Sequence, residues 1–300
     1  MPGEIYFVPT DSDGTQHHND ELTTWPLPTK SAGTWQPGEA IESATGWSIV
    51  LLPLDGLLDD LGERIFVAEK MPATGGHDRG RLISETDWTL RSGARFALDC
   101  VERVVPDPGG LTLPSGASVG DILKAARDYL DEDQQAAVGL LQRMSRIAAT
   151  RRLRHLGDEV GDLALALTAE DEAKDLDALD DPAWTAVAAL RDAVLSVVEA
   201  IRHDAFPKLF EDENRRYEAD IDGGISPQVV STPWGSFSTG GPSGVVPAWV
   251  AVGDAAERAR QAMTDTNGPE VGARYREWQL ERLAEALGLS NPSSDEPAAV

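Results

Sequence analysis

This 300-residue sequence contains a single cysteine, Cys100. One thiol cannot form an internal disulfide, and it excludes metal sites built from several cysteines. Long apolar runs are missing as well. The longest, "WSIVLLPL" from Trp47, is far shorter than the roughly 20 residues of a membrane-spanning helix, and Pro53 interrupts it. The residues after Met1 show no basic region followed by an apolar core, so no secretory signal is expected. These absences predict a soluble, cytoplasmic protein without a membrane segment.

Basic residues are scarce. The chain has 26 Lys and Arg against 51 Asp and Glu, which gives a formal charge of −25. Such a chain repels phosphate backbones and anionic membrane surfaces, and this argues against a nucleic-acid binder of the basic-patch kind. The same field attracts a basic protein partner or divalent cations. The alternative is an acidic surface that serves only to keep the protein in solution.

The residues that are present indicate a globular protein whose first third is rich in strands. Hydrophobic residues make up 41% of the chain. Short apolar runs bounded by Gly, Pro and Asp are typical of strands, and residues 1–85 contain "EIYFV" (4–8), "WSIVLLPL" (47–54), "RIFVAEKM" (64–71) and "RLISE" (81–85). The last two predict a hairpin joined across "ATGGHD", and "LDGLLDDLG" predicts a short helical turn.

From Thr86 the apolar residues recur at helical spacing, and Asp87 is a candidate N-cap for the first helix. A second helix is predicted over "SVGDILKAARDYLDED", a third from near Gln134, and another from Pro182. The predicted apolar face of the second helix is Val119, Ile122, Leu123, Ala126 and Leu130. That of the helix from Pro182 is Trp184, Val187, Leu190, Val194, Val197 and Ile201. Two helices close the chain, the last with an apolar seam of Tyr275, Leu280, Leu283 and Leu287.

Together these patterns predict an α+β fold, a small β-rich N-terminal region packed on a mainly α-helical body. The predicted segments are 1–85 (β-rich), 86–222 (helical), 223–249 (rich in Gly, Pro and Trp), 250–289 (C-terminal helices) and 290–300 (a flexible tail). The Gly- and Pro-rich residues 223–247 form either a long loop or a pair of short strands. Their region holds three candidate binding residues, Trp234, Phe237 and Trp249. These aromatic side chains either contact a partner or anchor the loop to the body.

Cys100 lies in the middle of the first predicted helix, within "ARFALDCVERVV". Its neighbours Asp99 and Glu102 are acidic and disfavour the thiolate that a reactive cysteine requires. Position 100 borders the apolar face of the helix, so we predict a buried, unreactive thiol. On the exposed side, Arg95–Asp99 and Asp99–Arg103 are predicted to form i,i+4 ion pairs.

Across residues 94–130, "FALDCVERV" and then "ILKAARDYL" resemble a helical immunity-protein domain family. That family carries A-x-D-C-A-E-R-V/A-L followed by A-A-R-x-[YWF]. The matching residues are Ala97, Asp99, Cys100, Glu102, Arg103, Val104, Ala125, Ala126, Arg127 and Tyr129. Val101 departs from the family's usual Ala, and its Ala- and His-rich third helix is missing. The resemblance implies an interaction role, with Asp99, Glu102 and Arg103 as candidate binding residues.

"DEVGDLALAL" at 158–167 is similar to the "EExGDLL" half-motif of MazG-type nucleotide pyrophosphohydrolases. The resemblance implies that Glu159 and Asp162 hold Mg²⁺ against a triphosphate. That family also needs E-x-x-E on the preceding helix, where this chain has Asp131 followed by Gln134. The alternative is an acidic helix start stabilised by its own macrodipole.

The histidines suggest a second metal hypothesis. His155, the adjacent His203 and Asp204, and a later Asp220 or Asp222 follow the H…HD…D order of helical metal phosphohydrolases. His17 and His18 are expected in a solvated polar loop. Chance supplies such an order in many acidic helical chains, so structural roles for these residues are the alternative.

The charge layout separates one basic island from an acidic segment. The island comprises Arg143, Arg146, Arg151, Arg152 and Arg154, and residues 158–181 hold ten acidic side chains against Lys174 alone. We predict that the two segments pair as antiparallel helices. The function predicted overall is an acidic interaction protein of immunity type that binds a basic protein. A Mg²⁺-dependent nucleotide pyrophosphohydrolase and a structural component of a larger assembly are the alternatives, and the oligomeric state stays open.

Overall fold

The computed structural model describes residues 5–18, 21–42, 50–74, 77–105, 118–131, 182–205, 228–232, 235–239 and 248–289. It confirms the α+β class, because antiparallel sheets within residues 6–85 are followed by a body of several packed helices. The chain divides into two compact units, one formed by Met1–Gly93 with Arg276–Val300 and the other by Ala94–Tyr275. The divisions fall inside helices α2 (Leu90–Glu102) and α8 (Pro269–Ala286).

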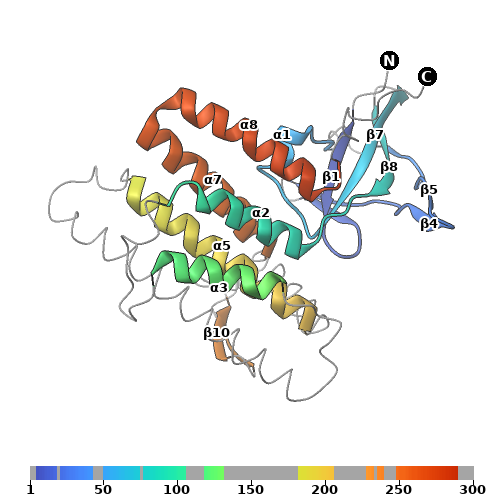
Figure 1. The fold of residues 1–300 in the computed structure, drawn as a ribbon. Helices are drawn as coiled ribbons and strands as arrows, with labels where there is room; N and C mark the ends of the chain where they lie inside the picture. The colour runs from blue at the N-terminus through green and yellow to red at the C-terminus, as the bar shows by residue number, and fades with distance from the viewer. Residues whose placement is uncertain are drawn as a thin grey trace, which may run out of the picture. The chain divides into compact units, whose positions relative to one another are not determined.

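The main sheet of the first unit has four strands in the order β1-β7-β8-β6, and every neighbouring pair is antiparallel. Figure 1 shows β1, β7 and β8 of this sheet. Its strands are β1 (Tyr6–Thr10), β7 (Arg64–Thr74), β8 (His77–Glu85) and β6 (Ile41–Glu42). The predicted hairpin is confirmed as β7 and β8, both of which extend beyond the apolar runs that marked them. Polar residues near the hairpin turn join the ladder because pairing satisfies their backbone groups.

Two smaller hairpins precede the long one: β2 (Thr15–His18) with β3 (Glu21–Thr24), and β4 (Thr29–Ser31) with β5 (Thr34–Gln36). The prediction of a polar loop at His17 and His18 was therefore wrong. His17 lies opposite Leu22 in the antiparallel ladder of β2 and β3. The threonines of these two strands favour extended backbone, because β-branched residues suit a strand.

The predicted strand at 47–54 is described only from Val50 onward. There, Leu52 makes an isolated bridge with Phe7. Immediately after Pro53 the chain turns into α1 (Leu54–Leu57), which confirms the predicted helical turn. Pro53 favours this change because its fixed φ suits a residue that precedes a first helical turn.

The core on one side of the main sheet surrounds Trp25, which is 1% exposed and packs with Val8, Phe66, Ala68 and Leu82. Burying an indole leaves its N–H in need of an acceptor. Trp25 Nε1 donates to Gln16 Oε1 (3.2 Å), and Gln16 Nε2 in turn donates to the carbonyl of Val50 (3.2 Å). This chain of bonds ties the small hairpin β2–β3 to the segment that leads into α1.

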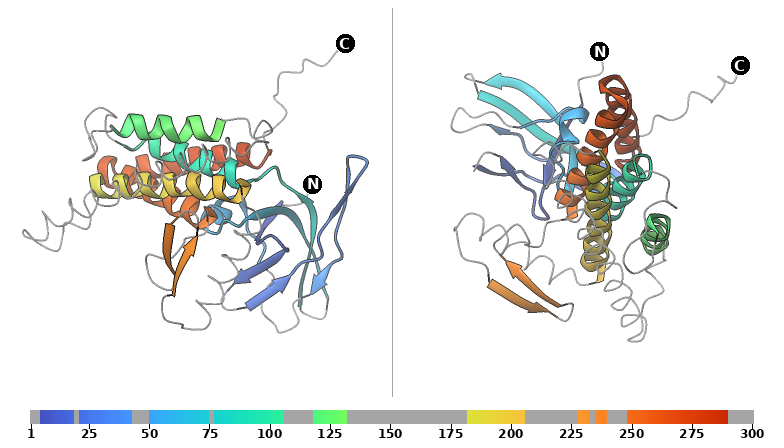
Figure 2. Two further views of the ribbon diagram at one scale, coloured as in Figure 1. Left: turned by 90° about the horizontal axis from the view of Figure 1, so that it is seen from below. Right: turned by 90° about the vertical axis from the view of Figure 1, so that its left-hand side faces the viewer.

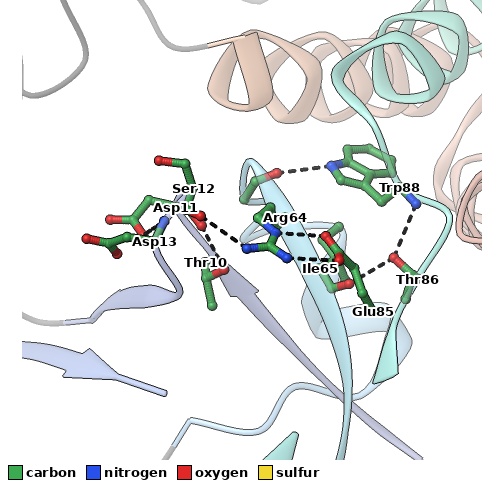
Figure 3. Close-up of polar contacts among 10 residues, drawn as sticks. Thr10, Asp11, Ser12, Asp13, Arg64, Ile65, Glu85, Thr86 and Trp88 are labelled. Carbon is green, nitrogen blue, oxygen red and sulfur yellow. Dashed lines mark hydrogen bonds and ion pairs between the residues drawn. The ribbon is translucent and has the colours of Figure 1, made fainter. Parts of the chain in front are cut away.

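A polar framework fixes the end of the sheet where the chain leaves for α2. Figure 3 shows the Arg64 guanidinium between the Glu85 carboxylate, which it grips with two bonds of 2.7 and 2.8 Å, and the Ser12 carbonyl at 3.1 Å. The bonds to Glu85 raise the pKa of Arg64. On the next segment, Trp88 Nε1 donates to the carbonyl of Gly62 (3.0 Å). These bonds hold Arg64 and Glu85 at the end of the sheet and Trp88 on the segment that follows it.

The second unit contains α3 (Val119–Asp131), α5 (Pro182–Ala205), α7 (Ala248–Asn267) and the hairpin of β9 (Gln228–Thr232) with β10 (Gly235–Thr239). The predicted apolar face of α3 is confirmed, with all five of its residues buried. α5 runs beside α7 and also packs against α3 (Figure 1 and Figure 2). Helix α7 carries a seam of buried small residues, Ala248, Ala251, Ala255, Ala259 and Ala262.

α5 is buried more completely than the predicted stripe implied. Val187, Leu190, Val194 and Val197 are buried as expected. Most residues between them are buried too, and over 185–200 only Leu195 is half-buried and only Arg191 is exposed. A helix that is buried nearly all round occupies a central position among packed helices.

The helix ends show capping that the sequence reading only partly anticipated. Asp87 was the wrong N-cap: α2 begins at Leu90, and Thr89 caps it reciprocally with Ser92. Ser118 and Asp121 form a similar capping box at α3, where the bonds from Ser118 lower the pKa of Asp121. Asp87 instead donates its backbone N–H to the carbonyl of Leu287, which follows α8.

Of the two alternatives for residues 223–247, the strand pair is the one observed, as β9 and β10. Trp249 lies outside that hairpin, on the first turn of α7. The predicted helix from Gln134, the basic island and the acidic segment 158–181 all lie outside the described residues.

Candidate functional site

Three of the residues that carry the resemblance to the immunity-protein domain form ion pairs between α2 and α3. Asp99 and Glu102 are three residues apart and share a face of α2. Both carboxylates accept hydrogen bonds from Nη2 of Arg127 on α3, at 2.8 Å and 2.6 Å. Three of the four matching charged residues, Asp99, Glu102 and Arg127, therefore form one ion-pair cluster. Their observed contacts hold two helices together.

A second arginine extends this contact. Arg95 Nη2 donates to the carboxylate of Asp131 (2.8 Å) and to the carbonyl of Leu130 (3.0 Å) at the end of α3. The predicted pair of Arg95 with Asp99 is replaced by these bonds. The reason is that an interhelical carboxylate and an unsatisfied carbonyl at a helix C-terminus compete for the guanidinium.

The Arg127 cluster is partly shielded from solvent. The side chains of Arg127 and Asp99 are 33% and 24% exposed, whereas that of Glu102 is 53% exposed. Burial lowers the pKa of Arg127, but its bonds to Asp99 and Glu102 outweigh this effect and the net shift is upward. The cluster is thus a fixed pairing of charges, in which Glu102 is the acid most open to solvent.

Cys100 is fully buried, as the sequence predicts. The carbonyl of this residue, which belongs to the last turn of α2, accepts a 2.5 Å bond from the hydroxyl of Tyr275. Carbonyls of a last helical turn have no partner within the helix, so a buried one requires a donor from elsewhere. Burial raises the pKa of Tyr275, which keeps the phenol protonated as a donor. Tyr275 was predicted as an apolar seam residue, and its polar role needs the fold to be seen.

A buried ion pair between α5 and α7 is the site that sequence reasoning missed. Asp192 Oδ2 lies 2.9 Å from Nε of Arg258, and its Oδ1 lies 3.8 Å from Nη1 of Arg191. The Asp192 side chain is only 9% exposed. Burial raises its pKa to about 6, against the opposing effect of the two arginines. The signal in the sequence is Asp192, which stands in a mostly apolar stretch of the helix, "AALRDAVLSVVEA".

The remaining predicted site residues are not brought together by the described structure. Glu159, Asp162, His155 and Trp234 lie outside the described residues. The backbone of His203 and Asp204 belongs to α5 and that of Phe237 to β10, but their side chains are not among those described. Trp249 is half-buried on α7, and Arg103 is exposed just after α2. The metal and pyrophosphohydrolase hypotheses therefore stay predictions.

Within the described ranges, no three His, Cys, Asp or Glu side chains gather as a metal ion requires. None of the helices in those ranges combines the length and apolarity needed to cross a membrane.

The chain matches no protein-family model, and neither a curated protein nor a solved structure is significantly similar to it. The resemblance to the immunity-protein domain consequently depends on the matching residues within 94–130 alone.

Proposed function

We propose that this protein is an acidic interaction protein of immunity type, which binds a basic protein partner. The observation that carries the proposal is the formal charge of −25, with 51 acidic residues against 26 basic ones. A field of this size attracts a basic surface from a distance and accelerates its association.

The ion pairs of the basic side chains support the proposal, because they place much of the positive charge beside carboxylates of the same chain. Many described arginines face carboxylates of the protein itself, as in Arg64–Glu85, Arg79–Glu42, Arg95–Asp131, Arg127–Asp99, Arg276–Asp59 and Arg282–Glu285. Locally neutralised cations contribute little to the field outside. The charge that reaches a partner is then the acidic excess.

In this proposal the α2–α3 cluster of Asp99, Glu102 and Arg127 joins two helices and does not contact the partner. Asp99 and Glu102 are engaged by Arg127, so breaking their pairing for a partner would cost the bonds that join the two helices. We therefore assign partner contact to acids outside the cluster, namely the acidic segment 158–181 and exposed helix residues such as Glu277 and Glu281.

Affinity capture at two ionic strengths tests the proposal. The tagged full-length protein is incubated with an extract of its source cells in low and high salt, and the captured protein is identified and purified. The expected result is a basic protein whose Kd, measured by calorimetry, weakens about tenfold or more between ~50 and ~250 mM NaCl. Capture of no basic protein, or a Kd indifferent to salt, would overturn the proposal.

Two variants with the same change of net charge locate the contact. Asp171→Asn with Glu172→Gln removes two charges from the acidic segment, and Glu277→Gln with Glu281→Gln removes two from α8. Equal weakening indicates that only the overall field acts, whereas selective weakening identifies the contacting segment.

An enzymatic assay on the same preparation separates the proposal from its alternative. Nucleoside triphosphates with Mg²⁺ are added, and release of pyrophosphate is measured. Release that is lost in Glu159→Gln would contradict a purely binding role.

A further inference from the structure

α5 carries a line of polar residues within its buried surface. Thr185, Asp192, Ser196 and Glu199 are each less than a tenth exposed. Their spacings of seven, four and three residues place them on one face of the helix. The Ser196 hydroxyl donates a hydrogen bond to the carbonyl of Ala193 (2.7 Å), within the same helix. Asp192 instead reaches across to Arg258 on α7, so it links the packing of these two helices to an ionisable group.

The ion pair of Asp192 is asymmetric in its exposure to water. The Asp192 side chain is 9% exposed, but those of Arg258 and Arg191 are 39% and 47% exposed. The carboxylate therefore loses its hydration while both cations keep much of theirs. Solvent around the arginines weakens their attraction for the carboxylate, and the cost of burying the charge outweighs it.

The other charges around Asp192 do not reverse this balance. On α7, the exposed Asp254 lies one turn before Arg258 and repels the carboxylate. α3 also packs against α5, but its charged side chains engage Ser118, one another or α2. These are Asp121, Lys124, Arg127, Asp128 and Asp131.

We propose that Asp192 makes the packing of α5 against α7 dependent on pH, with the two helices held more tightly when its carboxyl is protonated. Its folded-state pKa of about 6 lies above the ordinary value of 3.8. For an acid shifted upward, the stabilising contribution is complete below the unfolded pKa and is lost as the pH rises through the folded one. Ionisation above about pH 6 thus loosens the contact.

Urea unfolding of the full chain and of Asp192→Asn across pH 5 to 8 tests this proposal. The amide of Asn is neutral at every pH, so the variant lacks the proton-linked step. The unfolding equilibrium constant of the wild type, divided by that of the variant at the same pH, is expected to rise about tenfold from pH 5 to pH 8. Asp265→Asn removes an exposed carboxylate from the same α7 and serves as the control, whose ratio stays flat.

Parallel pH profiles of the wild type and Asp192→Asn would overturn the proposal. Should the variant fail to fold, the carboxyl carbon of Asp192 is titrated by NMR in the wild-type protein. A midpoint near 6 supports the proposal, and a midpoint near 4 overturns it. Amide exchange along α5 and α7, corrected for its intrinsic pH dependence, is expected to quicken above pH 6 in the wild type alone.

Discussion

Some side chains in this protein form hydrogen bonds with backbone groups that have no partner within their own helix. Tyr275 is the clearest case, because its hydroxyl serves the Cys100 carbonyl at the end of α2, 175 residues away in sequence. The apolar periodicity of α8 predicts that position 275 is buried, and it is. Periodicity cannot predict the bond, since it carries no information about which open carbonyl lies opposite.

Tyr275→Phe keeps the ring and removes the hydroxyl. We expect the free energy of unfolding to fall by about 1–3 kcal/mol, the cost of a buried carbonyl without its donor. Urea unfolding at constant pH measures this difference. A change within the error of the extrapolation would show that the carbonyl finds another donor.

Ala32 is a residue in an unfavourable conformation. It joins β4 to β5 together with Gly33, and the φ angles of the two are +49° and +83°. A left-handed conformation costs a non-glycine residue about 1–2 kcal/mol, and Asn-Gly is the preferred pair for such two-residue hairpin turns.

Ala32→Asn is therefore expected to stabilise the β4–β5 hairpin by about 0.5–1 kcal/mol. Amide exchange of residues 29–36 measures its local opening, and the exchange should slow several-fold. Ser31→Asn, at an exposed neighbour with ordinary φ, is the control that should not slow it. Equal exchange in all three proteins would refute the assignment of strain to Ala32.

At the scale of elements, hydrophobic spacing predicted the strands and helices that bury a regular face. The hairpin β7–β8, the apolar face of α3 and the buried thiol of α2 all follow from local pattern. The pattern gave a wrong prediction for β2 and β3. Their residues are mostly polar, and they form strands because the two segments hydrogen-bond to each other. The pattern also gave no sign that Asp192 faces Arg258, since that contact joins residues 66 positions apart.

The α2–α3 cluster is expected to couple the two helices measurably. A double-mutant cycle with Arg127→Met and Asp99→Asn should yield an interaction free energy of about 1 kcal/mol, because both side chains are largely shielded from solvent. The exposed i,i+4 pair Lys124–Asp128 offers a matched control. Its cycle should give only about 0.3–0.5 kcal/mol. A coupling no larger than this control would mean that Arg127 does not join the helices.

For the whole molecule, the acidic excess acts on stability as well as on association. Like charges repel more in the compact state than in the unfolded chain, and salt screens them within a Debye length of roughly 10 Å at 0.1 M. The charge of −25 was evident from the sequence, but its effect depends on how many cations are already paired. In the described structure many of them are.

The melting temperature is accordingly expected to rise by a few degrees between ~10 and ~150 mM NaCl. Differential scanning calorimetry measures the change, with KCl as a check for specific ion effects. A melting temperature that falls with salt would show that the surface ion pairs outweigh the general repulsion.

The first unit is assembled from both ends of the sequence. The N–H of Asp87 bonds to the carbonyl of Leu287, and Arg276 Nη2 reaches the carbonyl of Asp55 and the carboxylate of Asp59. During synthesis on a ribosome, the whole second unit (Ala94–Tyr275) emerges between the sheet and the C-terminal residues that supply these bonds. We therefore expect nascent chains stalled before residue 276 to leave the first 93 residues sensitive to protease, and full-length chains to gain resistance only after release.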